Sequence, residues 1–172
     1  LSQTLSGASG AGGGIVVISG TAAAPQMLGS LRMERLGYGA MTAAALEINA
    51  CSPGWPAQAA RLELSLRDAH AAGLDIEALT IEADSTDISH VLRLNSHSSA
   101  GNIELECRGA SQANRDWQGR CAKLQVGSAI GAARWTLDHE IAVNWRQTAA
   151  ALTIEPFCLK SGTSSLCSED RA

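Results

Sequence analysis

The chain has 172 residues, which is long enough for one domain that buries a sizeable core. Its net charge is −4 and only 17% of its residues are charged, so it has no basic stripe with which to bind nucleic acid. Hydrophobic residues reach 45% while aromatic residues reach only 3%, so the apolar content is mainly Ala, Leu, Ile and Val. The longest uncharged stretch, near residues 1–31, is too rich in Gly, Ser and Ala to form a membrane-spanning helix.

The first predicted element follows a glycine-rich stretch, "SGASGAGGGIVVISGT", at residues 6–21. A phosphate-binding loop follows a strand and opens a helix, whereas these glycines precede an apolar run at residues 15–18. The stretch also lacks the Gly-Lys-Ser/Thr sequence of a nucleotide-binding loop. We therefore interpret the glycines as turn residues ahead of a first strand.

Alternation of apolar and polar residues dominates the rest of the chain. In "RLELSLRD", residues 61–68, the leucines occupy one face and Arg, Glu and Ser occupy the other. This period of two predicts half-buried strands. The same pattern recurs at residues 74–84, 87–96, 101–109, 139–146 and 151–156.

Two alanine-rich segments, residues 41–50 and 57–73, could instead be helical, although the leucine alternation in the second outweighs its helix propensity. About ten short strands result, separated by Gly, Pro, Ser and Asp and without a linker. The pattern is typical of a sandwich, a barrel or a repetitive β array, in one continuous all-β segment over residues 1–172. A sheet with one recurring apolar face must close, curl or be covered.

Residues that could carry chemistry do not converge in the sequence. Asp138, His139 and Glu140 are adjacent, so on a strand they would point to alternate faces, and a polar turn explains them better. Asp84 and Asp87 fit a turn rather than a calcium loop, which needs more regularly spaced oxygen ligands. No spacing of the four histidines suits a metal, and we expect no catalytic residue, no metal and no cofactor. The tryptophans are predicted to anchor the core: Trp55, Trp117, Trp135 and Trp145.

The five cysteines include no Cys-x-x-Cys pair, which excludes zinc-ribbon and thioredoxin-like sites. Cys107 and Cys121 enclose a turn-like segment, as do Cys158 and Cys167, so these four are disulfide candidates. Two bridges among five cysteines allow fifteen arrangements, and the sequence alone does not select one. An oxidising compartment is favoured over the alternative of five buried thiols in a cytosolic protein.

Six segments occur in an order that resembles one family. They are "ISGTAAAPQMLGSL" (18–31), "RLGYGAM" (35–41), "IEADSTDISHVLRLNS" (81–96), "DWQGRCAKLQV" (116–126), "RWTLDHEIAV" (134–143) and the paired-cysteine segment "PFCLKSGTSSLC" (156–167). Together they resemble the TamB family, the AsmA-like periplasmic proteins of the translocation and assembly module. Ser85 stands where the family has Gly, and Cys51, Cys107 and Cys121 lie outside its pattern. The role of Cys51 is open.

The resemblance implies an elongated, curled sheet that forms an open, U-shaped groove with an apolar interior. It implies a segment from the middle of a larger periplasmic protein that is anchored in the inner membrane. Its implied roles are non-enzymatic: transport of phospholipid between the membranes and support of outer-membrane protein assembly. The implied partners are phospholipid acyl chains, a TamA-like outer-membrane barrel and outer-membrane protein clients.

The recurring apolar face is the candidate site. Exposing a sixteen-carbon acyl chain to water costs about 12 kcal/mol, and an aliphatic trough would remove most of that cost. The predicted groove-lining residues are Leu62, Leu64, Leu66, Ile81, Leu92, Leu94, Ile103, Leu105, Ile141, Val143 and Leu152.

The sequence is also compatible with three alternatives. The same face could be a closed, dry core, as in most β domains. The chain could be a binding module that captures strands of outer-membrane proteins by β-augmentation. It could also be a β-helical enzyme that acts on polysaccharide, which would need converging carboxylates.

Overall fold

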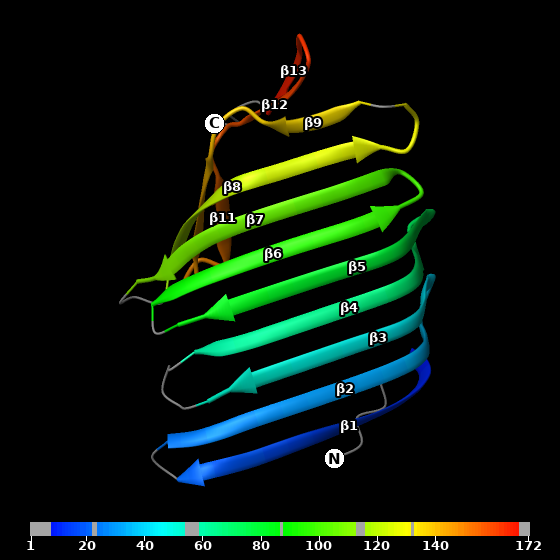
Figure 1. The fold of residues 1–172 in the computed structure, drawn as a ribbon, viewed down its shortest axis with the longest axis vertical. Coiled ribbons are helices and arrows are strands. Elements are labelled where there is room, and N and C mark those ends of the chain that lie inside the picture. Colours follow the sequence, from blue (N-terminus) through cyan, green and yellow to red (C-terminus); the bar gives the residue numbers. More distant parts are fainter. Residues whose placement is uncertain are drawn as a thin grey trace.

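The computed structural model describes residues 8–21, 24–53, 59–86, 88–112, 116–131 and 133–168. These residues form one antiparallel sheet of thirteen strands, with no helix among them (Figure 1). The first eight strands are β1 (Ala8–Thr21), β2 (Ala24–Tyr38), β3 (Met41–Ser52), β4 (Ala60–Ala71), β5 (Leu74–Ser85), β6 (Ser89–Ser98), β7 (Gly101–Ser111) and β8 (Trp117–Ser128). The last five are β9 (Arg134–Leu137), β10 (Ile141–Arg146), β11 (Ala151–Ile154), β12 (Cys158–Ser161) and β13 (Ser164–Cys167).

The strand order is a meander that forks near its C-terminal end. Strands β1 to β8 each pair with the next strand in the chain. The outer edge of β8 is shared, because its first half pairs with β10 and its last residues pair with β9. One branch then continues through β12 to β13, and the other ends at β11. The predicted fold class, an all-β elongated sheet that stays open, is confirmed.

The alternative helix at residues 41–50 is not formed, because this segment is most of β3. Leu46 and Ile48 lie opposite Leu66 and Leu64 of β4, so the period of two outweighs the helix propensity of the alanines. Asp138, His139 and Glu140 form the predicted turn, here between β9 and β10. The prediction that the tryptophans anchor a core is wrong for Trp145, which is 38% exposed, and Trp55 lies outside the described residues.

The register aligns apolar side chains in rows, since residues directly opposite on antiparallel strands share a face. Three rows run from β2 to β8, and none of them contains a charged residue. We call them together the apolar face. The first row is Leu31, Ile48, Leu64, Ile81, Leu94, Leu105 and Leu124; the second is Gly29, Ala50, Leu62, Ala83, Leu92, Cys107 and Cys121; the third is Met33, Leu46, Leu66, Leu79, Ser96, Ile103 and Val126.

The opposite face carries ion pairs from strand to strand. Arg93 lies at their centre, with its guanidinium 3.0 Å from Asp84, 3.7 Å from Glu82 and 3.7 Å from Glu106. A hydrogen bond from Lys123 lowers the pKa of the Glu104 carboxyl, and the positive charge of the ammonium group adds to this effect. The sheet is therefore charged on one face and aliphatic on the other.

Along one line across five strands, the pairing passes over one residue in each strand, and the register shifts at the two outer pairings, β1–β2 and β5–β6. The skipped positions are Gly10, Arg35, Ala44, Asp68 and Glu77, which follow one another from β1 to β5. Arg35 and Asp68 have φ angles of 53° and 47°, which non-glycine residues rarely adopt. Such bulges bend strands, and the right-hand ends of β2 to β5 turn away from the rest of the sheet in Figure 1.

At the other end of the sheet, the indole of Trp117 lies over two opposed glycines, Gly109 and Gly119. A methyl group at Gly119 would meet this ring and would lie 2.6 Å from the carbonyl oxygen of Arg108. We expect Gly119→Ala to lower the free energy of unfolding by about 1–3 kcal/mol, as overpacking does. Thermal unfolding of the variant and the wild type, measured by circular dichroism, would check this loss of stability. Gly13→Ala is the control, because nothing lies within 4 Å there; an equal loss in both variants would contradict the prediction.

Candidate functional site: an apolar face with a cavity at its bend

The apolar face is open to solvent. The chain exposes 11823 Å², whereas a compact monomer of 17.8 kDa exposes about 8,000 Å². Within the described ranges, no large side chain is fully buried, and Leu62 and Ile103 are each 41% exposed. The alternative of a closed, dry core therefore does not describe this sheet. An uncovered face of this size marks a binding surface.

Eight of the eleven predicted groove-lining residues lie on this face within the three rows. They are Leu62, Leu64, Leu66, Ile81, Leu92, Leu94, Ile103 and Leu105. The other three extend the same side of the sheet into one branch of the fork. Ile141 lies opposite Cys121 and Val143 opposite Gly119, while Leu152 pairs with Trp145 of β10.

Ile141 differs from the rest because it is only 4% exposed. It packs with Cys107 and Cys121, and around this cluster lie Leu105, Leu124, Leu137, Val143 and Phe157. Here the fork folds over the face enough to form a small core. Ile141 thus holds the fork together, while Leu152, at 57% exposure, stays open.

The disulfide candidates pair as Cys107–Cys121 and Cys158–Cys167. Each bridge joins directly opposed residues of neighbouring strands, β7 with β8 and β12 with β13. This register selects one of the fifteen arrangements. Cys51 is free and exposed on β3, on the charged face.

A cavity of about 390 Å³ lies on the apolar side of the bulge line; we call it the bend cavity. Two alanines, Ala43 and Ala69, lie directly opposite each other and are only 8% and 7% exposed. The larger apolar residues around them are Met33, Leu36, Tyr38, Met41, Leu66 and Ile76. Of these, only Leu66 was predicted from the sequence. The cavity forms where the strands bulge, and no pattern in the sequence predicted these bulges.

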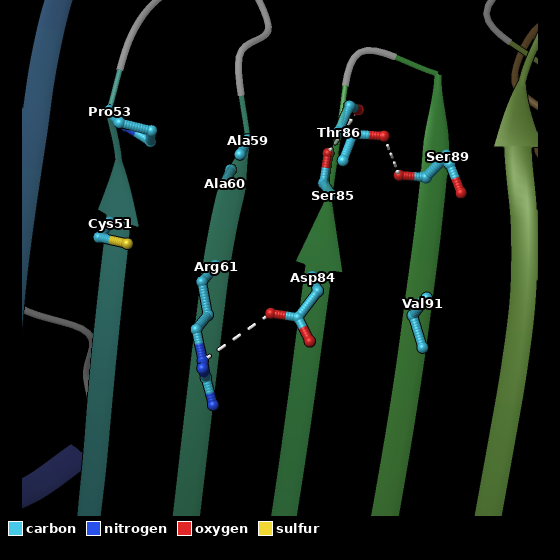
Figure 2. Close-up of a pocket in the computed structure, with 10 residues that line it drawn as sticks. All are labelled: Cys51, Pro53, Ala59, Ala60, Arg61, Asp84, Ser85, Thr86, Ser89 and Val91. Carbon is cyan, nitrogen blue, oxygen red and sulfur yellow. Dashed lines mark hydrogen bonds and ion pairs between the residues drawn. The ribbon is translucent and has the colours of Figure 1, made fainter.

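A second hollow, of about 290 Å³, opens on the charged face between the ends of β3 and β6 (Figure 2). Arg61 Nε lies 3.8 Å from Asp84 Oδ1, and Thr86 Oγ1 donates a hydrogen bond of 3.3 Å to the Ser89 carbonyl oxygen. Asp84 also binds Arg93, so its carboxylate is engaged in ion pairs. Asp87, its predicted turn partner, lies outside the described residues. The hollow offers no free acid or base.

The histidines of the described segments do not assemble a reactive site. His70 Nδ1 lies 2.7 Å from Asp75 Oδ1 at the exposed β4–β5 turn, and His90 Nε2 lies 2.8 Å from Ser111 Oγ. The part of the chain that the structure describes brings together no group of three or more His, Cys, Asp or Glu side chains that could hold a metal. It also contains no helix that could cross a membrane.

An open sheet with one long apolar face and an opposite face crossed by ion pairs defines a β-sheet scaffold with an uncovered apolar surface. Residues 1–172 match the family model described as "TamB, N-terminal domain". The chain belongs to the TamB family, a family of envelope proteins, and its two disulfides agree with a location outside the cytoplasm. No solved structure matches the chain significantly.

Proposed function

We propose that this chain is a non-enzymatic, periplasmic part of a TamB-like envelope protein, and that its apolar face shelters phospholipid acyl chains in passage between the inner and outer membranes. The observation that carries the proposal is the three apolar rows, which cross β2 to β8 without a charged residue and stay open to solvent up to the small core at Cys107 and Cys121.

The energetics favour passage over tight binding. Each methylene group removed from water contributes about 0.8 kcal/mol, so a sixteen-carbon chain gains about 12 kcal/mol when it is fully buried, and an open aliphatic face supplies the part of this gain that belongs to the side it covers. The rows repeat at every strand, about 4.8 Å apart, so an acyl chain finds an equivalent surface after each step. The ionic side chains stay on the opposite face, where they keep the sheet hydrated.

Membership of the TamB family supports the wider setting of the proposal. In that setting the full-length protein is anchored in the inner membrane and works with a TamA-like outer-membrane barrel. The full-length protein also assists the assembly of outer-membrane proteins. No cofactor takes part.

A second candidate function is capture of client strands by β-augmentation, and the edge of the sheet favours it. Strand β1 lies at the end of the strand order, and none of its fourteen residues is charged. Ile15 and Ile18 are each 71% exposed there. An apolar edge strand without charges is a template for another strand.

Native mass spectrometry of the chain purified from a bacterial periplasm tests the proposal. We expect phospholipid adducts that disappear when the chain is denatured. A chain without lipid, combined with photo-crosslinks from Ser19 of β1 to outer-membrane proteins, would replace the lipid proposal with strand capture. A crosslinker at Lys123, on the charged face of β8 and away from the edge, is the control position.

A further inference from the structure

The bend cavity differs from the rest of the apolar face in its shape. Over most of the sheet the side chains of the rows are half-buried on an open surface, but at the bulge line the strand ends turn and the apolar side becomes concave. Leu36, Ala43, Ala69 and Ile76 form one row across β2 to β5 directly beyond the bulges. The small alanines in the middle of the row leave space that Leu36 and Ile76 border on either side.

From this geometry we infer that the bend cavity is a holding site for a single phospholipid acyl chain. The inference rests on the proposed function and adds to it a defined place where the chain pauses. One water molecule occupies about 30 Å³, and a methylene group has a similar size, so a cavity of about 390 Å³ has room for roughly 13 methylene groups. That corresponds to most of one acyl chain.

The lining favours hydrocarbon over protein. A peptide strand in the cavity would need partners for its backbone N–H and C=O groups, and the lining is mostly apolar, with polar groups on Ser9, Tyr38, Thr42 and His70. His70 is already in contact with Asp75, which lies opposite it in the row next to Ala69. A hydrocarbon chain has no such requirement. Met33 and Met41 have flexible, polarisable side chains that adapt to different chain lengths.

The cavity also has a direction. Its lining comes from five successive strands, β1 to β5, which span about 19 Å at the usual strand spacing. An acyl chain in it would lie across the strands, along the long axis of the sheet. This is the direction in which a lipid would move along the apolar face.

The three methionines of the chain provide the test. Met33 and Met41 line the bend cavity, whereas Met27 lies on the same side of the sheet about 20 Å further along β2. We would label the methionine methyl groups with ¹³C and add a lysophospholipid with a nitroxide at carbon 16 of its acyl chain, below its critical micelle concentration. The Met33 and Met41 signals should broaden at least threefold more than the Met27 signal.

Each outcome decides one point. Equal broadening of all three signals would overturn the holding site but leave the proposed lipid function intact. No broadening at any methionine would count against both. Broadening of Met33 and Met41 by nitroxide-labelled stearic acid alone, with none from the lysophospholipid, would replace phospholipid by free fatty acid as the occupant.

A variant that fills the bend cavity tests the holding site independently. Ala69→Phe should reduce the affinity of the cavity for the lysophospholipid at least tenfold, while Ala78→Phe, exposed on the opposite face of β5, should not change it. Unchanged Met27 signals would show that both variants are folded. If Ala69→Phe does not fold, Ala43→Leu fills the same space from β3. Equal lipid affinity in the wild-type chain and a folded, cavity-filled variant would overturn the inference.

Discussion

Leu94→Arg is expected to reduce the phospholipid bound to the chain at least tenfold. Leu94 lies in the middle of the first apolar row, between Ile81 of β5 and Leu105 of β7. A guanidinium at this point would have to lose its hydration beneath an acyl chain with no partner on the face, which costs several kcal/mol. Native mass spectrometry of the variant, purified as for the wild type, measures the loss.

Asn95→Arg is the matched control for this experiment. Asn95 is the next residue on β6 and lies on the charged face opposite Glu104, so the same charge there meets a carboxylate. Its bound lipid should equal that of the wild type. Wild-type lipid levels in folded Leu94→Arg would show that the apolar face does not carry the lipid.

The structure makes Leu94 a better test position than Leu105. Leu105 packs against the core of Cys107, Cys121 and Ile141, so an arginine there would destabilise the fold as well as the surface. Leu94 lies outside that cluster. Loss of function in Leu94→Arg is therefore separable from loss of folding.

Removal of the Cys107–Cys121 disulfide is expected to have the largest effect on stability. The bridge spans 14 residues, and a loop of this length contributes about 3 kcal/mol on the chain-entropy model. Both sulfurs belong to the small core around Ile141, so the double variant Cys107→Ala/Cys121→Ala also loses packing there. For a chain of this size we expect the Tm to fall by about 6–12 °C. Differential scanning calorimetry measures it.

The second bridge serves as a comparison. Cys158–Cys167 closes the terminal hairpin β12–β13, away from the core cluster, so its removal should free that hairpin with less effect on the main transition. Cys51→Ala should change neither the order of the terminal hairpin nor the Tm of the main transition, because Cys51 is exposed and unbridged. A Tm that is equally low in the two bridge variants would contradict a special role for the Cys107–Cys121 core.

The period of two in the sequence was sufficient to assign the faces of the central strands. Leu62, Leu64 and Leu66 alternate with charged or polar residues, and a strand places alternate residues on opposite faces whatever its partner is. The interpretation of the glycines at residues 10–14 as turn residues ahead of a first strand is wrong, because they lie within β1. Glycine has no side chain with which to show the period of two, so this half of the strand carried no signal.

Features that depend on several strands at once were not predictable in this way. Arg35 and Asp68 adopt left-handed backbone conformations that neither residue type signals, and the line of bulges exists only because five neighbouring strands bring their skipped residues side by side. The cysteine pairing depends on which strands become neighbours. The burial of Ile141 depends on the fork at β8, where two strands share one edge.

The sequence by itself determined that this protein is an all-β chain with an aliphatic and a charged face, because side-chain alternation is a local property of each strand. Only the tertiary structure decided that the aliphatic face stays open, where it bends into a cavity and which cysteines meet. Those properties follow from strand register and curvature, which arise from pairing between segments far apart in the chain.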